Sequence, residues 1–245
     1  MMPTDHDHTP EGIADRLAVN PPPSYLKDGI YGAIDGAVTT FAVVSGVAGA
    51  GLASEIIIVL GVANLVGDGF SMAASNFLGT RAENQEVDRA LSIEQRHIRD
   101  HPEGEREEVR QILAAEGFEG DLLERAVTAV TRSERHWLAV MLRGEYGIAG
   151  RKKPPLPAAA TTFVCFVVVG AIPLAPFVLA LAVTPPVEPF LLSSLLTGGA
   201  FFVVGAVKAR FVLQPWIASA LETLLVGSTA AALAYLCGYL LRGLV

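Results

Sequence analysis

Hydrophobic and polar positions divide the chain into an apolar part, a polar part and a second apolar part. Residues 29–80 carry only three charged side chains, and residues 154–245 carry only five. The stretch 81–153 between them holds 15 acidic and 13 basic residues. A soluble protein distributes charge over every surface element, so this separation indicates membrane-spanning segments on both sides of a polar domain.

Five apolar segments reach the length of about 20 residues that a spanning helix needs. They run over roughly 29–50, 54–78, 158–183, 189–207 and 216–241. Helix is the expected form because lipid cannot satisfy open backbone groups, and none of the segments alternates as a barrel strand does. We therefore predict an all-α polytopic membrane protein with five transmembrane helices, the first two forming a tight hairpin around Gly51.

The polar stretch predicts a small helical domain inserted between the second and third spans. Helical composition continues from the second span to residue 100, where His101-Pro102 breaks it. Two further helices are expected at about 103–116 and 120–132, which makes a three-helix domain, and Trp137 to Tyr146 leads back toward the membrane. Pro173 and Pro176 are expected to kink the third span. The predicted parts are therefore a flexible tail (1–28), two spans (29–80), the polar domain (81–153) and three spans (154–245).

Composition and charge exclude several classes of protein. The 245 residues are 51% hydrophobic with a net charge of −7, which excludes a disordered chain. The acidic balance without a basic stripe argues against a nucleic-acid partner, and two cysteines cannot form a disulfide scaffold. All five histidines lie outside the predicted spans, so no Ser-His-Asp constellation arises there and we expect no enzyme and no permanently bound cofactor.

Lysine and arginine near the segment ends predict the orientation. Basic residues flank the N-terminal tail, both ends of 81–153 and the link between spans four and five; only Arg242 opposes this pattern. The N-terminus and 81–153 are therefore expected in the cytoplasm, with the C-terminus on the opposite side. The first residues do not resemble a signal peptide, which favours a prokaryotic plasma membrane, or a vacuolar membrane in a eukaryote. His6 and His8 in the tail are either inert or a minor metal contact.

Charged side chains at membrane depth usually mark a pathway or a site. Asp35 lies in the first span, and Asp68 lies in the second on the same helical face as Asn64 and Met72. Carboxylate and amide oxygens suit hard cations, and an added thioether shifts the preference toward transition metals. The alternatives are that Met72 fills the core and that Asn64 only joins helices. Gly32 and Gly36 form a GxxxG spacing, which predicts close helix packing or a subunit interface.

Three pairs in the polar domain lie at helical spacing and can chelate a cation. The pairs are Glu94 with His97, Glu105 with Glu108, and Met141 with Glu145. Each pair alone is also what an ordinary solvated helix face contains. Glu94 and His97 fit half of a di-iron carboxylate motif, but its second Glu-x-x-His is missing from the sequence.

Several runs resemble the vacuolar iron transporter family. They are DGAVTTFAVVSGVAGAG, GVANLVGDGFSMAASNFLGTRAE, PEGEREEVRQIL, WLAVMLRGEYG, GAIPLAPF, VKARF and SALETLLVG. The resemblance covers about residues 25–242. It implies five spans, a homodimer, a three-helix cytoplasmic metal-binding domain, and export of Fe²⁺, often with Mn²⁺ and similar ions such as Zn²⁺ and Co²⁺, from the cytosol in exchange for protons.

The resemblance also assigns roles to residues of this chain. Asp35 and Met72 match pore positions, and Lys208 and Glu222 match polar family positions in spans four and five. The cytoplasmic ligands that it implies are Glu94, Glu105, Glu108, Met141 and Glu145. Three positions depart from the family pattern. Asn64 replaces a Glu, whose charge Asp68 would supply, His97 stands where the family often has Glu, and Leu142 stands where a second Met can occur.

Two functions follow from these residues. In the first, cytoplasmic carboxylates with His97 and Met141 collect Fe²⁺, which then passes Asp35, Asp68 and Met72. In the second, a membrane-anchored sensor or buffer binds iron without transporting it.

Overall fold

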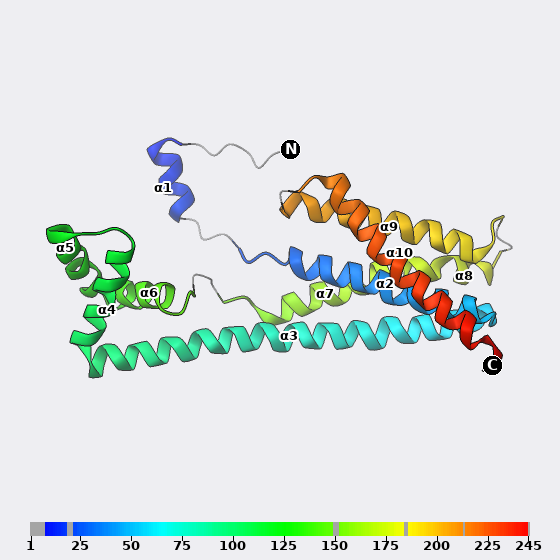
Figure 1. Ribbon diagram of the computed structural model, residues 1–245, viewed down its shortest axis with the longest axis horizontal. Coiled ribbons are helices and arrows are strands. Elements are labelled where there is room, and N and C mark those ends of the chain that lie inside the picture. Colours follow the sequence, from blue (N-terminus) through cyan, green and yellow to red (C-terminus); the bar gives the residue numbers. More distant parts are fainter. Residues whose placement is uncertain (1–7, 19–21, 149–151, 184–185, 213, 245) are drawn as a thin grey trace.

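The computed structural model describes residues 8–18, 22–148, 152–183, 186–212 and 214–244. These residues form helices joined by short turns, with no strand among them (Figure 1). The predicted all-α class is therefore confirmed for the described part of the chain.

Five helical segments are long and apolar enough to cross a membrane. They are α2 (Leu26–Ala50), α3 (Ser54–Asp100), α7 (Pro155–Gly170) continued by η1 (Ile172–Leu174) and α8 (Ala175–Ala180), α9 (Pro189–Val212), and α10 (Trp216–Leu241) with η2 (Arg242–Leu244). The five predicted spans are confirmed. The third is interrupted by a short 3-10 turn at Pro173, because proline removes a backbone donor from the helical ladder.

Helix α2 lies at the centre of the membrane part and packs most extensively against α7 and α10. Glycine allows these contacts, because a Cβ on Gly36 would lie 2.3 Å from the carbonyl oxygen of Phe166, and a Cβ on Gly32 only 2.2 Å from that of Thr162. The GxxxG spacing thus packs against α7 of the same chain. Phe41, Val44 and Phe166 complete a continuous apolar core beside it.

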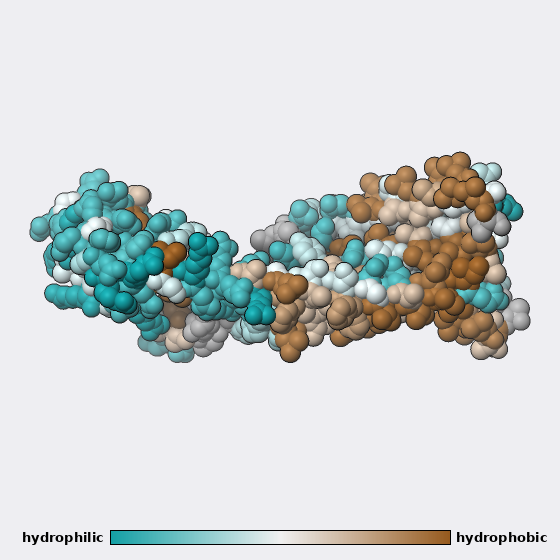
Figure 2. All heavy atoms as spheres, turned by 90° about the horizontal axis from the view of Figure 1, so that it is seen from below, coloured by the Kyte–Doolittle hydropathy of each residue, from teal (hydrophilic) through white to brown (hydrophobic). Residues whose placement is uncertain are grey.

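Helix α3 is continuous from the membrane part into the polar part of the molecule. Its 47 residues correspond to about 70 Å at 1.5 Å per residue. Figure 1 shows it as a single rod, and Figure 2 shows that the apolar surface lies at one end of the molecule and the hydrophilic surface at the other. The predicted extension of the second span to residue 100 is confirmed.

Three short helices follow α3; the first and third pack against α3, and the second packs against the other two. They are α4 (Pro102–Ala115), α5 (Gly120–Thr131) and α6 (Glu134–Gly144). Val109, Leu113, Val127, Trp137 and Met141 form their buried core. We call α4–α6 with the end of α3 the head. The exact domain boundary at 81–153 and its cytoplasmic location stay predictions.

The described residues of the predicted tail 1–28 include a short helix and the first residues of α2. Helix α1 (Pro10–Ala18) forms there, with the hydroxyl of Thr9 accepting a hydrogen bond from the backbone N–H of Gly12. That bond satisfies one free donor of the first turn. Helix α2 begins at Leu26, so the last residues of the predicted tail belong to the first span. His6 lies outside the described residues, and His8 is exposed.

We predict that Gly36→Ala destabilises the membrane part. The added methyl would meet the backbone of α7, which cannot move aside as a flexible side chain can, so the expected loss is about 1–3 kcal/mol. Thermal unfolding in detergent measures it. Gly67→Ala on α3 is the matched control, because nothing lies within 4 Å of its added Cβ. Equal melting temperatures for the two variants would contradict close packing of α2 on α7.

Candidate functional site

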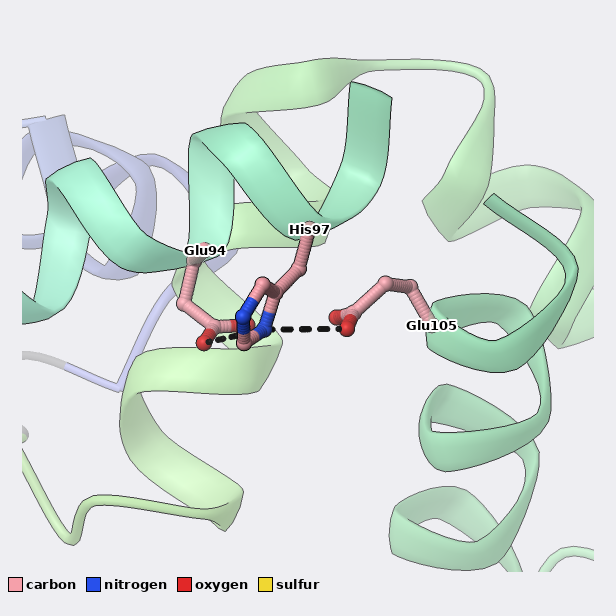
Figure 3. Close-up of side chains that lie close together, drawn as sticks. All are labelled: Glu94, His97 and Glu105. Carbon is pink, nitrogen blue, oxygen red and sulfur yellow. Dashed lines mark ion pairs between the residues drawn. The ribbon is translucent and has the colours of Figure 1, made fainter. Parts of the chain in front are cut away.

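The head brings together Glu94, His97 and Glu105, which we call the head site. One potential ligand atom from each residue lies within 4.8 Å of the other two. The imidazole Nδ1 of His97 is 3.4 Å from a Glu105 oxygen and 3.8 Å from a Glu94 oxygen. Figure 3 shows the three side chains pointing toward one another. The structure therefore joins two pairs that the sequence placed on separate helices.

The turn between α3 and α4 creates the head site. Glu94 and His97 lie one turn apart on α3, and Glu105 lies in the first turn of α4. Helix α3 ends because Pro102 disfavours helical backbone at the residue before it, and Pro102 then starts α4 at a position where proline fits. The chain reverses direction there, which carries Glu105 back toward the last turns of α3.

Two carboxylates of the head site are buried in an unusual way. Glu94 is 0% exposed and Glu105 is 4% exposed. In each of them the oxygen Oε2 has no hydrogen-bond partner among the described residues. A buried carboxylate without full pairing is costly, and a bound cation would satisfy both oxygens. The head site therefore has the ligand types of a metal centre and buried carboxylate oxygens that lack a positive partner.

Neighbouring acids add to the negative charge that a bound cation would neutralise. Burial, followed by the charges of Glu108 and Glu94, raises the pKa of Glu105 to about 7. Burial, followed by the charges of Glu94 and Glu108, also raises the pKa of Glu145. These couplings place the predicted ligands Glu108 and Glu145 near the head site. Because the pKa of Glu105 is higher in the folded than in the unfolded chain, the unfolded chain loses this proton first as the pH rises. Glu105 therefore lowers the stability of the metal-free protein increasingly as the pH rises toward 7.

The structure places Met141 in the core of the head and brings a further residue, Tyr146, to Glu94. Met141 is fully buried in the apolar core of the head, one turn before Glu145, and its core role is the one the structure documents. Tyr146 was not predicted, yet its hydroxyl donates a 2.9 Å hydrogen bond to Glu94. Burial and this hydrogen bond raise the pKa of Tyr146 to about 12. Sequence spacing could not identify this contact, because it joins α3 to the turn after α6.

In the membrane part, polar residues of α2 and α3 face one another. The amide of Asn64 donates hydrogen bonds of 3.3 Å to the hydroxyls of Thr39 and Thr40. Further along, the amide of Asn76 donates a 3.0 Å hydrogen bond to Asp28. We call the aligned side chains the polar stripe: Asp28, Asp35 and Thr39 of α2 with Asn64, Asp68, Met72 and Asn76 of α3.

The two cross-helix contacts fix the register between Asp35 and Asp68. The helices are antiparallel, so seven residues forward from Asp28 correspond to about seven residues back from Asn76. Asp35 and Asp68 lie near these positions, on the sides of α2 and α3 that the two contacts bring together. Asp35 is half-buried and Asp68 is exposed. Asn64 joins the helices, as one of its sequence interpretations proposed.

Met72 has a dual environment. It packs at the edge of the apolar core, and it also lines a cavity of about 320 Å³ with Asp28, Asn76 and Lys153. Asp28 and Asn76 were not singled out from the sequence. Helical spacing could have found them, because Asp28 precedes Asp35 by seven residues and Asn76 follows Met72 by four.

Lys208 and Glu222 lie apart from the stripe, on α9 and α10. The ammonium of Lys208 is 3.4 Å from a Glu222 oxygen. Lys208 also lines a cavity of about 620 Å³ with Lys27, Tyr31 and Ile34 at the beginning of α2. The structure therefore gives this pair a role in joining α9 to α10, and any role in transport stays a prediction.

Comparison with known proteins identifies the family. The sequence matches the profile of the VIT family over residues 26–239. Vacuolar iron transporter 1 of Arabidopsis thaliana is 31% identical over 211 residues, covering 86% of this chain and 83% of the relative. Vacuolar iron transporter 1 of Tulipa gesneriana is 30% identical over 214 residues, with coverages of 86% and 84%. The vacuolar iron transporter of Toxoplasma gondii is 28% identical over 225 residues, with coverages of 89% and 74%. The profile match runs from the first residue of α2 to the last turns of α10, and this chain is a member of the VIT family of membrane proteins.

Proposed function

We propose that the protein exports Fe²⁺, together with similar divalent ions such as Mn²⁺, from the cytosol in exchange for protons. The names of its relatives support metal ion transport as the general function. The observation that carries the finer proposal is that one unbroken helix, α3, holds Glu94 and His97 of the head site and four of the seven residues of the polar stripe. A metal ion bound at the head thus has further potential ligands along the same helix, α3.

The ligand chemistry favours transition metals over Mg²⁺ or Ca²⁺. The head site offers an imidazole beside two carboxylates, and the stripe offers the thioether of Met72 beside Asp35 and Asp68. Nitrogen and sulfur donors prefer softer divalent ions, whereas hard ions prefer oxygen alone. Carboxylates bind a metal only when deprotonated, so metal and proton compete for the same oxygens. This competition is the proposed basis of exchange.

Orientation and assembly are part of this proposal. The basic residues at the segment ends favour a cytoplasmic head, which would make export the direction of transport. Asp68, Ser71 and Ser75 are exposed on α3, so one side of the stripe lies open in a single chain. A second copy in a homodimer would shield these polar groups from lipid.

A membrane-anchored sensor or buffer is the alternative. The head site could bind metal without any contribution from the spans. The facing Asp35 and Asp68 argue against a simple anchor, because carboxylates at membrane depth are costly and an anchor has no need of them. Measured flux separates the two functions.

We predict that Asp35→Asn lowers metal flux about tenfold or more, since a lost charged ligand is worth about 1.5–3 kcal/mol. The assay places Fe²⁺ outside proteoliposomes that contain a metal-quenched dye and an acidic interior. Glu55→Gln is the matched control, because Glu55 is an exposed carboxylate in the first turn of α3, on the face away from Asn64. Flux that is equal in Asp35→Asn and wild type would remove Asp35 from the path.

We also predict that metal binding to the head site depends on pH. A metal at Glu105 displaces its proton, so the apparent affinity falls by up to about tenfold per pH unit below pH 7 and levels off above it. Calorimetric titration of the purified protein with Co²⁺ measures the effect.

The fall in apparent metal affinity below pH 7 is expected to remain in His97→Gln and to disappear in Glu105→Gln. If the affinity still falls below pH 7 in Glu105→Gln, another group causes the pH dependence of binding. An affinity that is level across this pH range in the wild-type protein would show that Glu105 does not hold the metal.

A further inference from the structure

A buried ionic network lies where α2, α3 and α7 meet, beyond the predicted transport residues. Asp28 is 7% exposed and forms an ion pair with the ammonium of Lys153. Its other oxygen accepts the hydrogen bond from Asn76, whose amide also donates to Thr162 at 2.6 Å. Thr80 in turn donates to the amide oxygen of Asn76 at 3.1 Å. Asp28 is therefore a positioned carboxylate whose bound cation belongs to the chain itself.

The backbone of Lys153 is anchored independently of its side chain. The amide of Asn84 donates to the carbonyl oxygen of Lys153 at 2.8 Å, and the backbone N–H of Lys153 donates to the amide oxygen of Asn84 at 3.1 Å. These two hydrogen bonds already fasten the segment before α7 to α3. The ammonium is consequently not required to hold the chain in place.

The neighbouring Lys152 offers a direct comparison. It pairs with Asp88 on the outside of the molecule, where the side chains are 44% and 57% exposed. In the Lys153–Asp28 pair the corresponding values are 25% and 9%. Only Lys153 reaches inward, and its ammonium also lies 5.1 Å from the centre of the Tyr25 ring.

The ammonium of Lys153 lies in the wall of the 320 Å³ cavity that Met72 also lines. We call this cavity the vestibule; its other lining residues include Asp28, Asn76 and Glu83. Met72, Asn76 and Glu83 follow one another at intervals of four and seven residues, so they share one face of α3. The vestibule thus presents carboxylate, amide and thioether groups beside two lysines, Lys153 and Lys27.

We propose that the vestibule is a further binding site for a divalent transition metal and that Lys153 is its built-in competitor. Asp28 is the anionic ligand, with Asn76 and Met72 as neutral donors. In the described conformation the Lys153 ammonium neutralises Asp28, and a metal binds there only after this ammonium swings away. The proposal deepens the proposed function and rests on it for the class of metal.

The physical reason is competition for one buried carboxylate. A buried carboxylate needs a positive partner, because leaving it unpaired is costly. A tethered ammonium and a divalent ion are alternative partners, and only one can use the same oxygen at a time. If the ammonium leaves Asp28 free in about one molecule in ten, its removal raises the apparent metal affinity about tenfold. The pair would then keep the vestibule closed to weakly bound ions.

The test counts Co²⁺ ions bound to the purified full-length protein by calorimetry. Lys153→Ala removes the ammonium while keeping the backbone hydrogen bonds to Asn84. We expect one more Co²⁺ per chain, or about tenfold tighter binding of an existing one, than in wild type. The double variant Lys153→Ala/Asp28→Asn is expected to lose this gain. Lys152→Ala is the matched control and should behave as wild type, because Lys152 pairs with Asp88 and leaves the Lys153–Asp28 pair intact.

Two results would overturn the proposal. One is a Lys153→Ala protein with a wild-type melting temperature and a wild-type Co²⁺ isotherm. The other is a gain of binding that persists when Asp28 is also replaced. If Lys153→Ala does not fold, Lys153→Gln provides the same comparison with a neutral polar side chain.

The test stays separate from that of the proposed function. Iron flux into proteoliposomes is measured for the same variants, and Lys153→Ala is expected to lower the half-saturating Fe²⁺ concentration about tenfold. If no protein carries metal, the transport proposal fails while the Co²⁺ count still decides the vestibule site. If wild type transports and Lys153→Ala changes neither measurement, only the vestibule proposal fails.

Discussion

The constraint on which the structure depends is the unbroken backbone of α3. One helix of 47 residues forms a wall of the membrane part and a wall of the head site. From Asp68 to Glu94 it covers about 40 Å at 1.5 Å per residue. A continuous helix keeps these groups at a fixed separation and in a fixed rotational relation. The close glycine contacts of α2 with α7 then hold α2, and with it Asp28 and Asp35, in register with α3.

The buried carboxylates along this helix differ in whether they have a positive partner. Glu94 and Glu105 are buried with one unpaired oxygen each, whereas Asp28 is buried with a complete set of partners. The first arrangement is poised for an added cation, and the second already contains one. Packing alone does not explain this contrast, because apolar residues would fill the same volumes at lower cost. In the proposed export path, a metal ion binds directly at the head site, whereas at Asp28 it must displace the ammonium of Lys153.

The sequence predicts the spans well because transfer of apolar helices into lipid depends on local composition. The extent of α3 also follows from helical composition up to the break at His101-Pro102, and the period of α3 places Asn64, Asp68 and Met72 on one face. The interior of the head site is a different case. Contact between Glu105 and His97 depends on the angle at which α4 leaves α3, and spacing along one helix carries no information about that angle.

The contacts of Asp28, Tyr146 and Lys153 were missed for a related reason. Each joins segments that are far apart in sequence, such as the start of α2 with the residue before α7. Asp28 also lies at the edge of its apolar segment, where a charge is ordinary and attracts no attention. The polar composition of the N-terminal tail likewise gave no sign of the short helix α1.

The most direct measurement records metal and proton movement together in proteoliposomes containing the wild-type protein. One dye reports metal arriving inside, and a second reports the internal pH. Exchange predicts that Fe²⁺ entry alkalinises an acidic interior, and that a reversed proton gradient slows Fe²⁺ entry. Fe²⁺ that binds the protein while neither metal nor protons cross the membrane would contradict the transport function and leave a membrane-anchored metal-binding protein.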